Sequence, residues 1–135
     1  MQALTPKLKL IQNLELELKT HEQFDVPVRH YFADGFYARE MTVPAGTLLT
    51  GKTHRSEHLC FITQGSARVA SDEFTGEVTA PYTYVSKPGA KRAILALEDL
   101  VWTTVHLTSE TDLLVLEDLL IEPEVDELPH CEEVT

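Results

Sequence analysis

The feature that most constrains the fold is a series of short, strand-like runs between Phe36 and Leu107. β-branched and aromatic residues are frequent in these runs, and Gly, Pro, Asp and Ser separate them about every 8 to 12 residues. The intervals are too short for crossover helices, which argues against a parallel α/β sheet. We therefore expect an all-β fold over residues 36–107, an antiparallel sandwich or barrel.

The segment before these strands, residues 1–35, is expected to flank the β domain as a helix or an edge strand. Apolar residues recur at helical spacing in LTPKLKLIQNLELELKT, and Thr5 followed by Pro6 matches a helix start. Leu14, Leu16 and Leu18 also alternate with acids, as in an edge strand. The helix is the favoured interpretation.

The segment after the strands, residues 108–135, is expected to contain a short helix and an acidic tail. SETDLLVLEDLLI predicts the helix, with Ser109 or Thr111 as its cap and Pro123 as its stop. A chain of 135 residues fits one domain with a single core.

Charge and composition exclude several classes of protein. The net charge is −11, and residues 1–92 carry all 11 Lys and Arg against 10 Asp and Glu. Because acids balance the cations there, we expect no basic stripe for nucleic acid apart from the cluster Lys87, Lys91 and Arg92. No apolar run approaches the roughly 20 residues of a membrane span, and the N-terminus has no signal-peptide core. We expect a cytoplasmic protein. The two cysteines, Cys60 and Cys131, form no disulfide or CxxC pattern.

The run GKTHRSEHLCFITQG places His54 and His58 four residues apart, before and within a strand-like segment. In one continuous strand their Cα atoms would be about 13 Å apart, too far for convergence on a metal. A tight connection at residues 55–57 would instead put them on adjacent antiparallel strands that face one interior. His58, Cys60 and Ile62 would then share the inward face.

A second run, VWTTVH, places Trp102, Thr104 and His106 on one face of a strand. This set mixes polar and aromatic side chains, which suits an interior that binds a ligand better than a dry core. Tyr82 and Tyr84 alternate on another strand-like run. Ordinary packing is the favoured interpretation of this pair, and the alternative is that they form part of the wall of the same pocket, with Tyr84 as a ligand-binding candidate.

The order of glycines and histidines resembles the cupin superfamily. The first cupin motif, Gly-x5-His-x-His-x3,4-Glu-x6-Gly, matches in spacing at five positions, which are Gly46, Lys52, His54, His58 and Gly65. Lys52 replaces the first metal-ligand His of that motif, and His58 replaces its Glu. In the second motif the matching positions are Lys87, Gly89 and Arg92, so that Arg92 replaces another ligand His.

The resemblance implies a single-domain cupin, an RmlC-like jelly-roll barrel of six to eight antiparallel strands with short flanking helices. It covers roughly residues 36–107. Several runs, such as KPGAKRA, are also similar to small cupins encoded by bacteriophages and prophages. Cupins of this size commonly pair through their sheets, so a homodimer is expected.

In the cupin arrangement His106 would complete a three-histidine site with His54 and His58. Imidazole ligands suit Zn, Fe, Ni or Cu better than Mg or Ca. The residues leave three interpretations open, which are a metal site, a metal-free pocket whose histidines bind the ligand directly, and structural or exposed histidines. His21, His30 and His130 lie outside this frame and are expected at the surface.

Lys52 and Arg92 suggest a second functional hypothesis. Two cations would repel a metal unless acids such as Glu40 or Glu98 compensate, and they would favour an anionic small molecule or sugar. Arg92 in a buried ion pair with Glu98 or another acid is the competing interpretation. Oxygenase, isomerase or hydrolase activity, ligand binding without catalysis, and a structural phage protein all remain open.

Overall fold

The computed structural model describes residues 6–20 and 26–122. The expected cap at Thr5, the helix stop at Pro123, the acidic tail, and the surface positions of His21 and His130 fall outside these ranges. No helix of the described part is long and apolar enough to cross a membrane.

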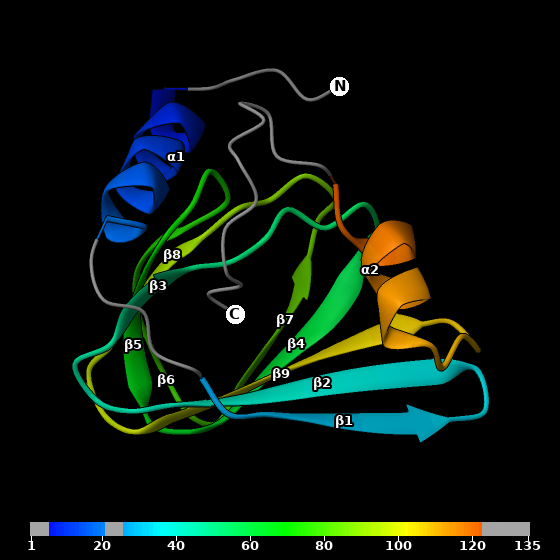
Figure 1. Cartoon of the computed structure of the whole chain (residues 1–135). Helices are drawn as coiled ribbons and strands as arrows, with labels where there is room; N and C mark the ends of the chain where they lie inside the picture. Colours follow the sequence, from blue (N-terminus) through cyan, green and yellow to red (C-terminus); the bar gives the residue numbers. More distant parts are fainter. Residues whose placement is uncertain (1–5, 21–25, 123–135) are drawn as a thin grey trace.

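Two antiparallel sheets form the body of the protein (Figure 1). One has five strands in the order β1-β2-β9-β4-β7, the other four in the order β3-β8-β5-β6, and neither closes on itself. The described residues thus contain nine strands, where six to eight were expected. Their bounds are β1 Val28–Ala33, β2 Phe36–Val43, β3 Leu48–Thr50, β4 His58–Gln64, β5 Ser66–Ala70, β6 Thr75–Thr79, β7 Tyr82–Ser86, β8 Ala93–Ala96 and β9 Leu100–Leu107.

The two sheets enclose the main hydrophobic core, and strand alternation selects its members. Along β4 the predicted inward set His58, Cys60 and Ile62 is buried, while Leu59 is exposed. Along β9, Trp102 and His106 are buried on the inward face. The core therefore changes along β4 and β9 from aliphatic residues at one end to histidines at the other.

Two helices flank the sheets, as expected. α1, Pro6–Leu18, is the helix that its apolar spacing favoured, and it buries Leu8, Ile11 and Glu15. α2, Leu113–Leu120, packs Leu116 and Leu120 against Tyr37 of β2. Its cap is Asp112, whose side chain accepts from the backbone N–H groups of Leu114 and Val115, so the expected caps at Ser109 and Thr111 are wrong.

Candidate metal centre

The three histidines reach one place from three different segments. His58 is the first residue of β4, and His106 lies near the end of β9. The residues that follow His58 and precede His106, Leu59 and Val105, are partners in the ladder between these strands. Both imidazoles therefore extend from the same end of the five-stranded sheet into the interior.

His54 enters from the connection between β3 and β4. The chain bends at Arg55 and Ser56, which confirms the turn expected there. The expectation that His54 lies on a strand adjacent to β4 is wrong, because its bridge partner is Ile121, just after α2. Backbone bonds from Arg55 N–H to the Leu120 carbonyl (2.7 Å) and from Glu122 N–H to the Thr53 carbonyl (2.8 Å) hold this connection in place.

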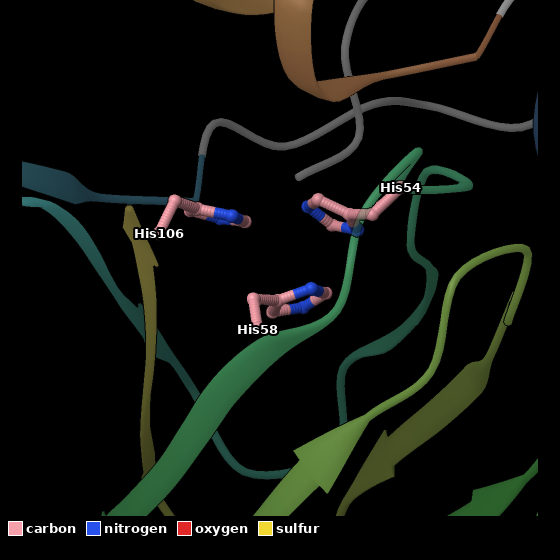
Figure 2. A group of neighbouring side chains, drawn as sticks. All are labelled: His54, His58 and His106. Carbon is pink, nitrogen blue, oxygen red and sulfur yellow. The ribbon is translucent and has the colours of Figure 1, made fainter. Parts of the chain in front are cut away.

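The three imidazole rings face one another (Figure 2). Ring centroids are separated by 4.3 Å for His54 and His58, 4.6 Å for His58 and His106, and 5.1 Å for His54 and His106. One potential ligand atom from each ring lies within 4.8 Å of the others. His58 and His106 are buried, and His54 is half-buried.

Burial keeps these imidazoles neutral. It lowers the pKa of His54 to about 2, with repulsion from His58 and His106 as the next causes. It lowers the pKa of His106 to about 4, and it also lowers the pKa of His58. Neutral imidazole is the form that binds a metal ion.

The hydrogen bonds of the cluster leave one buried nitrogen of each ring without a partner. His58 Nδ1 lies 3.0 Å from the Ser56 carbonyl, which only accepts, so Nδ1 carries the proton and Nε2 presents its lone pair. That Nε2 is buried without a hydrogen-bond partner, as are Nδ1 of His54 and Nδ1 of His106. Buried polar atoms without partners are costly, and coordination of a metal ion would satisfy them.

The dimensions fit a metal ion after a small adjustment. Metal–nitrogen bonds of about 2.1 Å allow two ligand nitrogens to lie at most about 4.2 Å apart. The three ligand atoms lie within 4.8 Å, so rotations of the side chains would bring them into range. The hydrogen bond from His58 Nδ1 to the Ser56 carbonyl is of the type that orients metal-binding histidines in proteins.

A cavity of about 330 Å³ adjoins His54 and His106 between α2 and the first two strands. Its polar lining includes His30, Tyr37 and Arg39 on β1 and β2, and its apolar lining includes Leu116 and Ile121. The sequence reasoning did not assign these three polar residues to the pocket. The alternation of Tyr37, Arg39 and Met41 in FYAREMTV was a signal that could have identified two of them.

The expected ligand-binding residues divide between two cavities. Lys52, Arg92, Trp102 and Thr104 line a small space of about 50 Å³ next to His54 and His58. Tyr84 instead lines a separate cavity of about 220 Å³, whose lining contains none of the three histidines. Tyr84 is thus not brought to the histidine cluster, although the other four residues are.

Both cations that replace cupin ligand positions have acidic partners. Lys52 pairs with Glu117 of α2. Arg92 is buried, donates to Glu73 at 2.7 Å and to the Ser86 hydroxyl at 2.6 Å, and lies over the ring of Tyr84. The compensating acids are therefore Glu117 and Glu73, and not Glu40 or Glu98. The competing interpretation of Arg92, a buried ion pair with Glu98 or another acid, is confirmed with Glu73 as that acid.

The apparent basic cluster of the sequence is not a basic surface. Lys87 pairs with Glu57 at 2.7 Å. The Lys91 side chain is fully buried and pairs with Glu15 of α1 at 3.2 Å. Since Arg92 also has its carboxylate, no uncompensated run of cations exists at residues 87–92 for a phosphate backbone.

Comparisons with known proteins identify the fold. No protein-family model matches the sequence, and no curated protein matches it either. Among solved structures, a cupin 2 domain-containing protein from Halorhodospira halophila is similar over 78% of this chain and 75% of its own, with 20% identity and a TM-score of 0.56. KdgF from a Halomonas species is similar over 70% and 92%, with 16% identity and a TM-score of 0.52.

An acetylacetone dioxygenase from Acinetobacter johnsonii also resembles this chain, over 64% of it and 66% of the dioxygenase chain, at 15% identity and a TM-score of 0.52. At these identities the likeness concerns the fold alone. It agrees with the two antiparallel sheets and with the motif spacing at Gly46 and Gly65. The chain has the jelly-roll fold of the cupin proteins.

Proposed function

We propose that this protein is a metal-binding cupin in which His54, His58 and His106 hold one divalent transition metal ion. The observation that carries the proposal is that one potential ligand atom from each of the three rings lies within 4.8 Å of the others, and that each ring has a buried nitrogen without a hydrogen-bond partner. An all-imidazole ligand set favours Zn, Fe, Ni or Cu. Structural histidines of an ordinary core would be expected to have their nitrogens satisfied.

Three protein ligands leave at least one coordination position for a small molecule. A bound metal ion would supply Lewis-acid polarisation of an oxygen atom or activation of water. The cavity of about 330 Å³ beside His54 and His106 has the size of a small-molecule site, and α2 contributes the apolar side chains of Leu113, Leu116 and Leu120 to its wall. We propose that the ligand of this protein binds there.

Within this cavity, Tyr37 is placed to contact a ligand and to act as a hydrogen-bond donor. It is buried, stacks on His106 with 6.0 Å between ring centroids, and shares a 2.7 Å hydrogen bond with His30 Nδ1. Burial raises the pKa of the Tyr37 hydroxyl, so it stays protonated at neutral pH.

The alternative of a metal-free cupin that binds an anion through Lys52 and Arg92 has less support. Each cation is already neutralised by a carboxylate, so an incoming anion would have to displace Glu117 or Glu73. A structural phage protein stays a prediction from the sequence. Co-purification with virion components, together with an unchanged phenotype after His54→Ala, would favour that function.

Metal titration tests the proposal. We expect the metal-free protein to bind one Zn²⁺ or Ni²⁺ per chain and to gain thermal stability in proportion to metal excess. His58→Ala and His106→Ala should each abolish this gain. His30→Ala, which removes a histidine of the same cavity outside the cluster, is the matched control and should retain it. Equal stabilisation of all four proteins would refute the assignment.

We also propose a homodimer formed through the outer face of the five-stranded sheet. An in-register apolar row crosses this face from β1 to β7, and consists of Tyr31, Ala38, Val105, Leu59 and Val85. Leu59 and Val85 are each more than two-fifths exposed. Light scattering should give a dimer that Leu59→Glu converts to a monomer, because a charge in a buried apolar interface is costly. A monomeric wild-type protein would contradict this proposal.

A further inference from the structure

A second cavity, of about 220 Å³, lies between the two sheets beside their edge strands β6 and β7. Its walls are mainly apolar and aromatic. The lining consists of Val69, Ser71, Glu73, Phe74, Val78, Tyr82, Tyr84, Val85, Lys87, Arg92 and Trp102. Phe74 and Tyr82 are each more than one-third exposed, so the entrance to the cavity is mainly aromatic.

This cavity is distinct from the candidate metal centre. None of the three histidines contributes to its lining. Arg92 and Trp102 line both this cavity and the small space beside His54 and His58, so these two side chains form a common wall. Arg92 is fixed in that wall by Glu73, by Ser86 and by the ring of Tyr84, 5.1 Å from the guanidinium carbon.

The charged groups of the lining and the Ser71 hydroxyl are matched within the protein, whereas the Tyr84 hydroxyl is buried without a hydrogen-bond partner. One Glu73 oxygen accepts from Arg92 at 2.7 Å, and the other accepts from the Lys87 backbone N–H at 3.0 Å. The Lys87 ammonium pairs with Glu57. The Ser71 hydroxyl bonds the backbone of the following turn at Glu73 and Phe74. A charged ligand would therefore break an existing pair, whereas an uncharged one would not.

The size and shape of the cavity select an aromatic ring. An apolar cavity of about 150 Å³ is sufficient for benzene. Tyr84 and Trp102 meet edge to face with 6.2 Å between centroids, and Tyr82 lies 5.8 Å from Tyr84. A further ring could join this array in the stacked or edge-on arrangements that aromatic side chains prefer.

We propose that the cavity between β6 and β7 binds a small, uncharged, substituted benzene, independently of the histidine cluster. The ring lies against Trp102 and Tyr84 on one side and against Val69 and Val78 on the other, and its substituent points toward the aromatic entrance. Burial of the ring supplies the affinity, because the charged groups of the lining are already paired within the protein.

Fluorescence of Trp102, the sole tryptophan of the sequence, tests this proposal directly. The probe is nitrobenzene, an uncharged aromatic molecule that quenches indole emission on contact. Trp102 is buried, so collision with a quencher in bulk water should be inefficient. We expect nitrobenzene to quench it along a saturable curve, equally with a chelator and with Zn²⁺ present. Acrylamide, a polar quencher without a ring, should give only shallow, unsaturated quenching.

Two variants of lining residues connect the signal to the site. Tyr82→Ala, which removes a partly exposed ring at the entrance, should weaken nitrobenzene binding with little risk to folding, and Val78→Phe, which fills the cavity, should weaken it at least tenfold. Val115→Phe makes the same change on α2, outside the cavity, and is the matched control. Thermal unfolding of each variant confirms that the fold is retained.

The outcomes separate this cavity from the metal centre. Saturable quenching that Val78→Phe and Tyr82→Ala weaken and His54→Ala leaves intact supports the proposal. Three results would overturn it: unsaturated quenching of the wild-type protein, equal binding by Val78→Phe, Tyr82→Ala and Val115→Phe, and loss of binding in His54→Ala alone. The last result would place the aromatic molecule on the histidine side of Arg92, whether or not a metal binds there.

Discussion

The imidazole of His58, at the start of β4, lies 4.6 Å from that of His106, near the end of β9, measured between ring centroids. The Leu59–Val105 pair of the same ladder fixes this approach, so it does not depend on a flexible loop. A site formed on paired strands is more rigid than one formed on loops. The third histidine, His54, lies in the connection between β3 and β4. Its position depends on the bridge to Ile121, just after α2.

The Arg92–Glu73 pair should contribute to stability more than a surface pair does. Glu73→Gln leaves the guanidinium of Arg92 buried without its carboxylate, and we expect a loss of about 2–3 kcal/mol in the free energy of unfolding. Glu77→Gln removes the carboxylate from the exposed Arg68–Glu77 pair and should cost less than about 1 kcal/mol. Urea unfolding of both variants measures the difference, and equal losses would contradict this role of Arg92.

Acid should destabilise the metal-free protein before its carboxylates titrate. The folded pKa values of His54 (about 2) and His106 (about 4) are lower than the ordinary 6.5. As pH falls below 6.5, the unfolded chain therefore binds protons that the folded chain does not. Both contributions to stability are complete above pH 6.5; that of His106 is lost as the pH falls toward about 4, and that of His54 continues to decrease toward about pH 2.

The measurement is the free energy of unfolding against pH, in the presence of a chelator. His106→Phe should have a shallower slope just below pH 6.5, because one of the groups responsible is removed. Ordinary carboxylates titrate near about pH 4 and contribute little in this upper range. An identical slope in the variant would show that His106 is not kept neutral by burial.

Gly65, in the tight turn between β4 and β5, should tolerate no side chain. Its φ is 86°, and a Cβ would overlap the carbonyl group of Asp99. Gly35 has the same φ of 86°, but a Cβ added there would meet nothing within 4 Å. Gly35→Ala should therefore cost about 1–2 kcal/mol from the left-handed backbone alone. Gly65→Ala should cost clearly more, and thermal unfolding that ranks the two equally would contradict the close approach.

The buried pair of Glu15 on α1 and Lys91 should also contribute to stability. The Lys91 side chain is fully buried beside Glu15, which also accepts from the Thr50 hydroxyl at 2.8 Å. Glu15→Gln should cost about 3 kcal/mol of stability, because a buried ammonium loses its carboxylate. The double variant Glu15→Gln, Lys91→Met removes that charge and should recover part of the loss. A double variant less stable than Glu15→Gln would argue that Lys91 acts through its other contacts.

Local sequence patterns predicted much of this structure because alternation and turn residues act over short distances. They identified β2 as FYAREMTV, the inward faces of β4 and β9, and the turn at residues 55–57. They could not reveal that His54 pairs with Ile121, or that Glu73 and Glu117 neutralise Arg92 and Lys52. These contacts join residues far apart in sequence, and no local period encodes them.

The pocket was only partly predicted for the same reason. β1 belongs to the segment expected to flank the strands at residues 1–35, yet it pairs with β2 and brings His30 beside Tyr37. Tyr84 has the inward position that its alternation indicated, but the cavity that it lines is a different one. Strand alternation predicts which face of the sheet a side chain lies on, but it does not predict which cavity between the sheets that side chain lines.

X-ray absorption spectroscopy of the zinc-loaded protein tests the central claim most directly. We predict that the coordination sphere contains three imidazole nitrogens at about 2.0–2.1 Å and that His54→Ala reduces them to two. A spectrum with fewer than three imidazoles in the wild-type protein, or with sulfur or mainly carboxylate ligands, would contradict the assignment of His54, His58 and His106 as one metal site.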